Sequence, residues 1–183
     1  MYVFLDFEAS SLGKHGYPIE VAWVFEDGRS EAHLIRPAPG WIDWDPAAQA
    51  IHHITRETLE RDGTPHEAVA ARMVEELTGH DLFASAPSWD GKWLSALLRA
   101  AGLPRHTLRL RDTEEAQHQT VRAILADVVL PGKLNEAAAD LIALAAVRWQ
   151  GKNPAHRALA DAEEERERWL YVHNLASTEA ERR

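Results

Sequence analysis

Two carboxylates, Asp6 and Glu8, interrupt an apolar run near the start of the sequence. The apolar run over residues 3–7 predicts a strand that is buried on both faces. Residues two apart on a strand point to the same face, so both acids project side by side. Two like charges at partly buried positions repel each other and lose hydration. A bound cation is the usual reason to keep such a pair, and the alternative is that the acids cap loops or meet arginines.

Three later residues could join this pair. Asp90 falls in the first turn of a predicted helix, directly after a predicted strand, where an acid also simply favours the helix dipole. His156 and Asp161 lie five residues apart, which leaves them about 140° apart if both belong to one helix. They converge only if His156 precedes the helix and Asp161 lies inside it. The alternative is a surface histidine beside an acid on a helix face.

These residues, taken in order, resemble the motifs of the DEDDh 3′–5′ exonucleases, a family with the ribonuclease H-like fold. The family includes ribonuclease T, oligoribonuclease and the proofreading domains of replicative polymerases. Its Asp-x-Glu motif is matched by Asp6 and Glu8, and its acid after an aromatic residue by Asp90. Its histidine five residues before an aspartate is matched by His156 and Asp161. The resemblance covers roughly residues 2–172, and the motifs are specific as an ordered set.

Two further segments support the resemblance, and three positions depart from it. Residues 18–22 are similar to the family's second strand, and residues 51–55 to its His-Gly-Ile-Thr segment. His53 stands where that segment has glycine, residues 9–12 lack the usual threonine pair and glycine, and residues 85–86 replace a common His-Asn. These departures lie near where the family holds the terminal nucleotide, so they affect the predicted substrate preference more than the predicted metal site.

The resemblance implies a two-metal hydrolase. Four carboxylates without a thiolate make a hard, oxygen-rich site that suits two Mg²⁺ or Mn²⁺ ions, which can clamp a phosphodiester when about 4 Å apart. Asp6 is the expected bridge between the ions, and Glu8, Asp90 and Asp161 complete the ligand set. Neutral His156 would take the proton from the attacking water.

The residues expected to hold the substrate carry weaker signals. Backbone N–H groups of Ala9 and Ser10 could bind the terminal sugar, and apolar side chains could stack on or wedge between bases. For the aromatic residues, packing in the core is the alternative. The predicted substrate-binding set is Phe7, Ala9, Ser10, Trp41, Trp44, His53 and Ile54.

The predicted elements describe an α/β fold with a ribonuclease H-like mixed sheet flanked by helices. Strands over the first apolar run and over residues 19–25 and 31–36 form an antiparallel meander. Helices and parallel strands then alternate: a short helix to residue 50, helices over 65–77, 89–101, 113–126 and 135–149 and from 157 past 169, and strands over 81–86 and 107–111. A capping box is expected to start the helix over 65–77. We expect one exonuclease domain over residues 1–175 and a frayed tail over 176–183.

Composition narrows the class of protein. The 183 residues contain no cysteine, which excludes disulfides, zinc–thiolate sites and cysteine nucleophiles. The formal net charge of −9 argues against a broad phosphate-binding face, although residues 91–111 contain five basic side chains and no acid. Acids inside the first apolar run argue against a signal peptide, and no apolar run is long enough to span a membrane. We expect a cytoplasmic protein.

The predicted function is metal-dependent 3′–5′ exonuclease activity on the 3′ ends of single-stranded DNA or RNA, releasing nucleoside 5′-monophosphates. One alternative is a catalytically silent module that binds nucleic acid or protein on the same fold. Another is a metal-dependent hydrolase of small nucleotides. The sequence does not decide whether the substrate is DNA or RNA, or whether the protein is a monomer or a homodimer.

Overall fold

A computed structural model describes residues 1–182 and contains a mixed sheet of six strands. The strands β1, β2 and β3 form the expected antiparallel meander, and β5 and β6 run parallel to β1, as expected for a ribonuclease H-like sheet. The order across the sheet is β4-β3-β2-β1-β5-β6. Their bounds are β1 Tyr2–Ala9, β2 Pro18–Phe25, β3 Ser30–Arg36, β4 Thr64–Pro65, β5 Asp81–Ala84 and β6 Leu110–Asp112.

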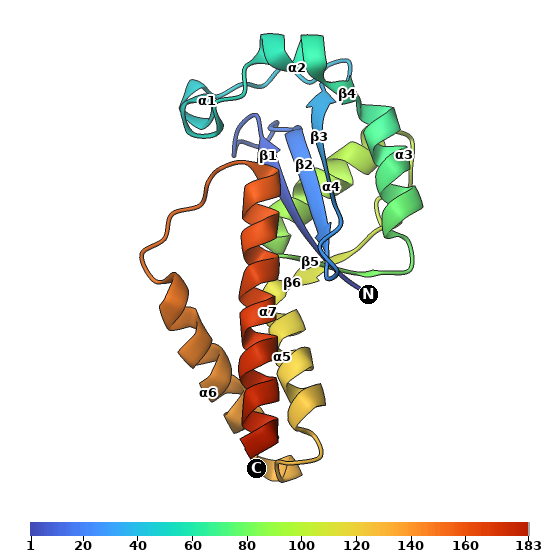
Figure 1. Cartoon of the computed structure of the whole chain (residues 1–183). Coiled ribbons are helices and arrows are strands. Elements are labelled where there is room, and N and C mark those ends of the chain that lie inside the picture. Colours follow the sequence, from blue (N-terminus) through green and yellow to red (C-terminus); the bar gives the residue numbers. More distant parts are fainter. Residues whose placement is uncertain (183) are drawn as a thin grey trace.

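Seven α-helices surround this sheet (Figure 1). Short 3-10 turns at Pro131–Lys133 and Val147–Trp149 flank α6. None of the helices within residues 1–182 has the length and apolarity needed to cross a bilayer. The helices are α1 Pro46–His52, α2 Arg56–Asp62, α3 His66–Leu77, α4 Pro87–Ala100, α5 Thr113–Leu125, α6 Leu134–Ala146 and α7 Ala158–Arg182.

Alternation along β1 divides the core between the two faces of the sheet. Val3, Leu5 and Phe7 pack with residues of α3 and α4 on one face. Phe4 packs on the other face, against residues of β5, α5 and α7, including Trp169. Because successive strand residues alternate between faces, Asp6 and Glu8 follow Phe4 onto the α7 face. The buried strand therefore carries its two acids toward the helix that supplies the third motif.

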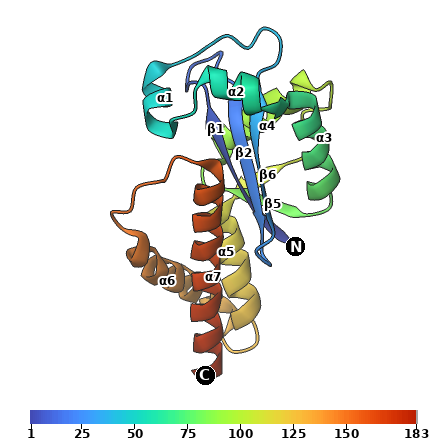
Figure 2. The ribbon, with the colours of Figure 1, turned by 45° about the horizontal axis from the view of Figure 1, so that its top comes forward.

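The lower part of α7 belongs to a separate apolar cluster with α5 and α6. This cluster contains Val121, Leu125, Ala138, Val172 and Ala176, all buried. Figures 1 and 2 show α5 and α7 side by side below the sheet, with α6 inclined away from them. The frayed tail expected over residues 176–183 is therefore wrong as far as Arg182, because Ala176 is buried and α7 continues to Arg182. Arg183 lies outside the described residues.

Several helix starts differ from the sequence prediction. The helix α3 begins at His66 after Pro65, which makes no side-chain cap, because Thr64 is drawn into β4 beside β3. The expected capping box therefore does not form. The helix α4 begins at Pro87, before the expected start, and α2 was not predicted at all. Asp45 does cap α1, accepting a hydrogen bond from the Ala47 N–H at 2.8 Å.

Candidate active site

The first two acids lie at the carboxyl end of β1, next to strand β2. Asp6 pairs with Ala22 of β2, and Glu8 pairs with Glu20. The carboxylates of Asp6 and Glu8 accept no hydrogen bond and form no ion pair within the described residues, although both are partly buried and Arg157 lies near enough to lower the pKa of Glu8. The start of the sequence thus presents two uncompensated carboxylates on one face of the sheet.

The other two acids come from the first turns of two helices. Asp90 is 4% exposed in the first turn of α4, and its Oδ2 has no hydrogen-bond partner in the structure described. Asp161 lies in the first turn of α7 and accepts a hydrogen bond from the Ala155 N–H at 2.7 Å. The positive ends of both helices therefore face the carboxylates, which partly offsets their charge.

His156 lies outside the helix, as its convergence with Asp161 requires. It adopts a left-handed backbone conformation with φ of 54°, which is uncommon for a residue with a side chain. The turn brings a ring nitrogen of His156 and carboxylate oxygens of Glu8 and Asp161 within 4.8 Å of one another. Asp6 lines the same hollow of about 290 Å³, and Asp90 lines a groove that also contains Asp6, Glu8 and His156. All five predicted residues meet at this end of the sheet.

The crowding of acids perturbs their ionisation. Burial raises the pKa of Asp6 well above its ordinary value, and Asp90, Glu8 and Asp161 add to the rise. Burial, with help from Asp161 and Glu20, raises the pKa of Glu8 to about 7. Burial also raises the pKa of Asp90 to about 7, although nearby backbone N–H groups oppose the rise. Such shifts mean that the charged forms of these acids are destabilised and that a bound cation would stabilise them.

A fixed ion pair holds the segment that carries His156. Arg157 donates to Glu20 through Nη2 at 2.7 Å and Nε at 3.1 Å. Glu20 also accepts from the Ala158 N–H at 3.0 Å, which caps the first turn of α7. The Glu20 side chain is only 5% exposed. Strand β2 is therefore tied to both residues that follow the left-handed His156.

A fifth buried acid, Glu165, was not predicted as a site residue. It lies one turn after Asp161 on α7, is 9% exposed and lines the same hollow. Burial raises its pKa, while nearby Arg168 and Thr113 oppose the rise. Its charge in turn raises the pKa values of Asp6 and Asp90. The signal was present in the sequence, because a spacing of four puts Asp161 and Glu165 on one helix face.

Part of the predicted substrate-binding set lines an apolar groove beside the acids. The groove has a volume of about 430 Å³ and includes Phe7 and Ala9. Three exposed apolar residues that were not predicted also line it: Leu12, Ile51 and Trp89, with exposed fractions of 68%, 50% and 42%. Large exposed apolar side chains gathered at one groove indicate a binding surface rather than core.

His52 adds a polar group to this groove and was also missed. Its Nδ1 accepts a hydrogen bond from the Ile54 N–H at 3.0 Å, so the ring proton of the neutral form lies on Nε2. Burial lowers the pKa of His52, which favours that neutral form. The Nε2 has no partner among the described residues. His52 is thus a buried N–H donor in the groove wall.

Three other residues of the predicted substrate-binding set, Ser10, Trp41 and Trp44, do not line this groove. Ser10 is fully buried, and its N–H already donates to the Tyr17 carbonyl at 2.9 Å, so it offers no open amide. Trp41 stacks on Tyr17 with ring centroids 5.1 Å apart. Trp44 donates to Gln49 at 2.8 Å. Both tryptophans belong to the packing around Tyr17 and do not line the groove.

His53 and Ile54 also serve the fold. His53 ends α1 in a left-handed conformation with φ of 59° and donates its N–H to Gln49, where the resembling family has glycine. Ile54 is 4% exposed and packs with Leu59. Neither residue lines the groove. The prediction located the right segment, but the groove is met by the adjacent His52 and Ile51.

Structural comparison finds this architecture in solved structures of exonuclease I. Exonuclease I from E. coli in complex with a dA16 oligonucleotide gives a TM-score of 0.64 at 16% identity, over 97% of this chain and 42% of that chain. The enzyme from Methylocaldum szegediense gives 0.65 at 16% identity, with the same coverage. The zinc-bound E. coli exonuclease I–ssDNA complex gives a TM-score of 0.60 at 17% identity, over 100% of this chain and 40% of that chain. The chain has the exonuclease I fold.

The likeness has a defined extent. No protein-family model and no curated protein matches the sequence. The chain spans about two-fifths of the exonuclease I chains that it matches. Identity at this level establishes the fold, and the chemistry must be argued from the residues themselves.

Within the exonuclease I fold, the donor set suits a hard cation. Carboxylate oxygens dominate, and the described chain offers no thiolate. The raised pKa values of Glu8 and Asp90, and the Oδ2 of Asp90 that has no hydrogen-bond partner among the described residues, suit carboxylates that a cation would stabilise in their charged form. Oxygen-rich sites of this kind prefer Mg²⁺ or Mn²⁺. The residues therefore fit divalent cations, with His156 beside them.

Proposed function

We propose that the protein is a metal-dependent 3′–5′ exonuclease that hydrolyses single-stranded nucleic acid and releases nucleoside 5′-monophosphates. The observation that carries this proposal is the convergence of Asp6, Glu8, Asp90, Asp161 and His156 at one end of the sheet. Burial and mutual repulsion raise the pKa values of Asp6, Glu8 and Asp90 despite the nearby Arg157, so a bound cation would stabilise their charged forms. The resemblance to the DEDDh family and the exonuclease I fold agree with this chemistry.

The four acids would hold two Mg²⁺ or Mn²⁺ ions, which would activate water and stabilise the departing oxygen. Asp6 would be the central ligand of this set, as expected from the resemblance, and the charges of the three other acids all raise its pKa. Glu8, Asp90 and Asp161 would complete the ligand set. Each contributes charge at a fixed position, since two lie on a buried strand and two on helix first turns.

His156 would act as the general base. One ring nitrogen would take a proton from the water that attacks phosphorus. The bond from phosphorus to the 3′ oxygen of the preceding nucleotide then breaks, and that oxygen leaves with the electron pair and gains a proton. The terminal nucleotide departs with its phosphate on the 5′ oxygen. The left-handed turn at His156 and the Arg157–Glu20 pair hold the base in position.

The apolar groove beside the acids would receive the terminal nucleotide. Phe7, Leu12, Ile51 and Trp89 offer flat or branched surfaces against which a base can stack without sequence readout. The His52 Nε2 offers one N–H donor to the sugar or phosphate.

Digestion of 5′-labelled single-stranded DNA and RNA tests the proposal. With Mg²⁺ or Mn²⁺ we expect a ladder that shortens from the 3′ end, and EDTA should abolish it. A 3′-terminal phosphate should slow cleavage, and a circular strand should resist it. Asp6→Asn is the matched inactive control. Binding without cleavage under all conditions would favour the silent module, whereas cleavage of the circle would indicate an endonuclease.

A further inference from the structure

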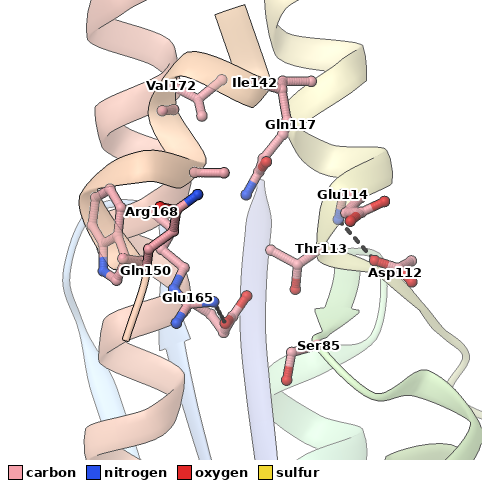
Figure 3. Close-up of a pocket in the computed structure, with 13 residues that line it drawn as sticks. Ser85, Asp112, Thr113, Glu114, Gln117, Ile142, Gln150, Glu165, Arg168 and Val172 are labelled. Carbon is pink, nitrogen blue, oxygen red and sulfur yellow. Dashed lines mark hydrogen bonds and ion pairs between the residues drawn. The ribbon is translucent and has the colours of Figure 1, made fainter. Parts of the chain in front are cut away.

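A second cavity adjoins the carboxylates on the side away from the apolar groove. It has a volume of about 450 Å³ and lies between α5, α6 and α7 (Figure 3). Figure 3 shows Thr113 and Gln117 of α5 and Glu165 of α7 extending into this space. Exposed residues such as Glu114 and Gln150 line it as well, so the cavity reaches the surface. Its size is that of sites for small organic groups.

The cavity continues from the acid-lined hollow. Ser85, Glu165 and Arg168 line both spaces. On the opposite side, the hollow shares Asp6, Phe7, Glu8 and His156 with the apolar groove. The three spaces therefore form one row, with the predicted metal ligands in the middle. A strand whose scissile phosphate lies at the ligands must place one nucleotide on each side of them.

The walls of the cavity suit a flat, largely neutral group. Much of the lining is carbon, from Ile142, Ala145, Trp149 and Val172. Gln117 brings an amide that both donates and accepts, so it can meet the edge of any base. The Thr113 hydroxyl is buried beside Glu165 but forms no hydrogen bond of good geometry in the described structure. These groups together provide stacking surface and unused polar capacity.

The charges of the cavity argue against a phosphate inside it. Asp112, Glu114 and Glu165 line it. Among the residues described as lining the cavity and the acid-lined hollow, Arg168 is the one arginine or lysine. It stands at the boundary and pairs with Glu164 and Glu165. The geometry therefore favours a phosphate at the boundary and a base in the cavity.

We propose that this cavity binds the nucleobase on the 5′ side of the scissile bond. The inference rests on the proposed function, which assigns the terminal nucleotide to the apolar groove and so leaves this space for its neighbour. The apolar groove and the cavity would then hold the strand on the two sides of the acids. Substrates of at least two nucleotides gain this contact, whereas a single nucleotide ester does not.

Filling the cavity from its exposed rim tests the inference. Ala146 is exposed on α6 and lines the cavity, so Ala146→Trp blocks the space without disturbing the core. Ala143→Trp adds the same side chain at an exposed position of α6 outside the lining. Affinity is measured by anisotropy of a 5′-fluorescein strand in Ca²⁺. The strand carries either a normal or an abasic nucleotide second from the 3′ end, and hydrolysis is measured in Mg²⁺.

We expect the abasic site to weaken binding to the wild type about tenfold, the usual scale for losing one stacked base. Ala146→Trp should weaken binding of the intact strand by the same factor. It should leave binding of the abasic strand as it is in the wild type, which is the signature of a direct contact. Ala143→Trp should behave as the wild type. Gln117→Leu, which adds no bulk, should shift affinity in the same direction by a smaller factor.

Two outcomes would overturn the inference: equal affinity of the wild type for intact and abasic strands, or unchanged affinity of Ala146→Trp for the intact strand. Hydrolysis separates this failure from failure of the proposed function. If either outcome occurs but the intact strand is still cleaved in Mg²⁺, the exonuclease proposal is supported and the cavity contact is refuted. Binding that depends on the base but is followed by no cleavage would support the cavity contact and refute the exonuclease proposal.

Discussion

Glu8 and Glu20 lie opposite each other on β1 and β2, yet their surroundings give the two carboxylates different numbers of hydrogen-bond partners. Glu20 has two hydrogen bonds from Arg157 and one from the Ala158 N–H. Glu8 has no such partner in the described chain, and its pKa rises to about 7. A fold that fully satisfies one acid could satisfy its neighbour. The fold therefore satisfies Glu20 within the protein, whereas Glu8, Asp6 and Asp90 keep raised pKa values that a bound cation would oppose.

The largest effect should come from removing charge in the uncompensated region. Asp6→Asn should lower the rate of strand hydrolysis about a thousandfold or more, since it removes a ligand and developing charge is left unstabilised. The metal-free protein should gain on the order of 1 kcal/mol in unfolding free energy, because repulsion is relieved. Single-turnover kinetics and urea unfolding in EDTA measure the two effects. A loss of both activity and stability would indicate a structural acid.

His156 joins the two regions, because a ring nitrogen lies within 4.8 Å of carboxylate oxygens of Glu8 and Asp161, while its neighbour Arg157 forms an ion pair with Glu20. His156→Ala should cost roughly a hundredfold in rate, the usual scale for a general base, and should retain metal binding. The wild-type rate should rise with pH as the base loses its proton, and that rise should vanish in the variant. Loss of metal affinity with an unchanged pH profile would instead make His156 a ligand.

Breaking the compensated region should have a smaller catalytic effect and the opposite effect on stability. Glu20→Gln should lower kcat about tenfold with little change in KM, because the base shifts while the groove is intact. It should cost about 2 kcal/mol in stability, because Arg157 and the α7 cap lose a charged partner. Glu31→Gln is the matched control, since Glu31 pairs with Arg72 on β3 away from the site. Equal kcat losses in both variants would refute a positioning role.

A change of pH is the mildest perturbation, because it alters the charge of the acids without removing a side chain. Glu8 and Asp90 bind protons more tightly when folded, with pKa values of about 7. Their favourable contribution is complete below pH 4 and is lost as pH rises toward about 7, on the order of 2 kcal/mol in EDTA. The hydrogen bonds from Arg72 lower the pKa of Glu31 despite its partial burial, so Glu31 affects the pH dependence of stability only at lower pH. Glu8→Gln should flatten the decline between pH 5 and 8, and an unchanged slope would contradict these shifts.

Much of the fold could be predicted from short-range patterns, because apolar runs and turn residues identified β1 to β3. The five motif residues were predicted from their order and the family resemblance, since each local pattern alone left an alternative open, and the helix expected from residue 157 does begin after His156. The antiparallel pairing of Glu8 with Glu20 follows once those strands are accepted. The tail was mistaken because Ala176 looks unremarkable alone, and only packing against α5 and α6 buries it.

The groove and the second cavity could not be predicted in the same way. Their lining residues come from distant segments that meet only in the folded chain. Trp41 and Trp44 suggested base stacking because they lie in a polar loop, but Trp41 stacks on Tyr17 and Trp44 packs beside the same ring at a tilt. Leu12, Ile51 and Trp89 gave no local signal, since an exposed apolar residue has no sequence pattern of its own. Glu165 is the exception, because its spacing from Asp161 was readable.

Titration with Mn²⁺ tests the difference between the two regions most directly. Isothermal calorimetry at pH 7.5 should detect two ions binding to the wild type, with release of protons from the acids whose pKa values are raised. Glu20→Gln should keep this binding, and Asp6→Asn should lose it. Absence of Mn²⁺ binding by the wild type, or equal binding by Asp6→Asn, would contradict a metal centre at the carboxylate cluster.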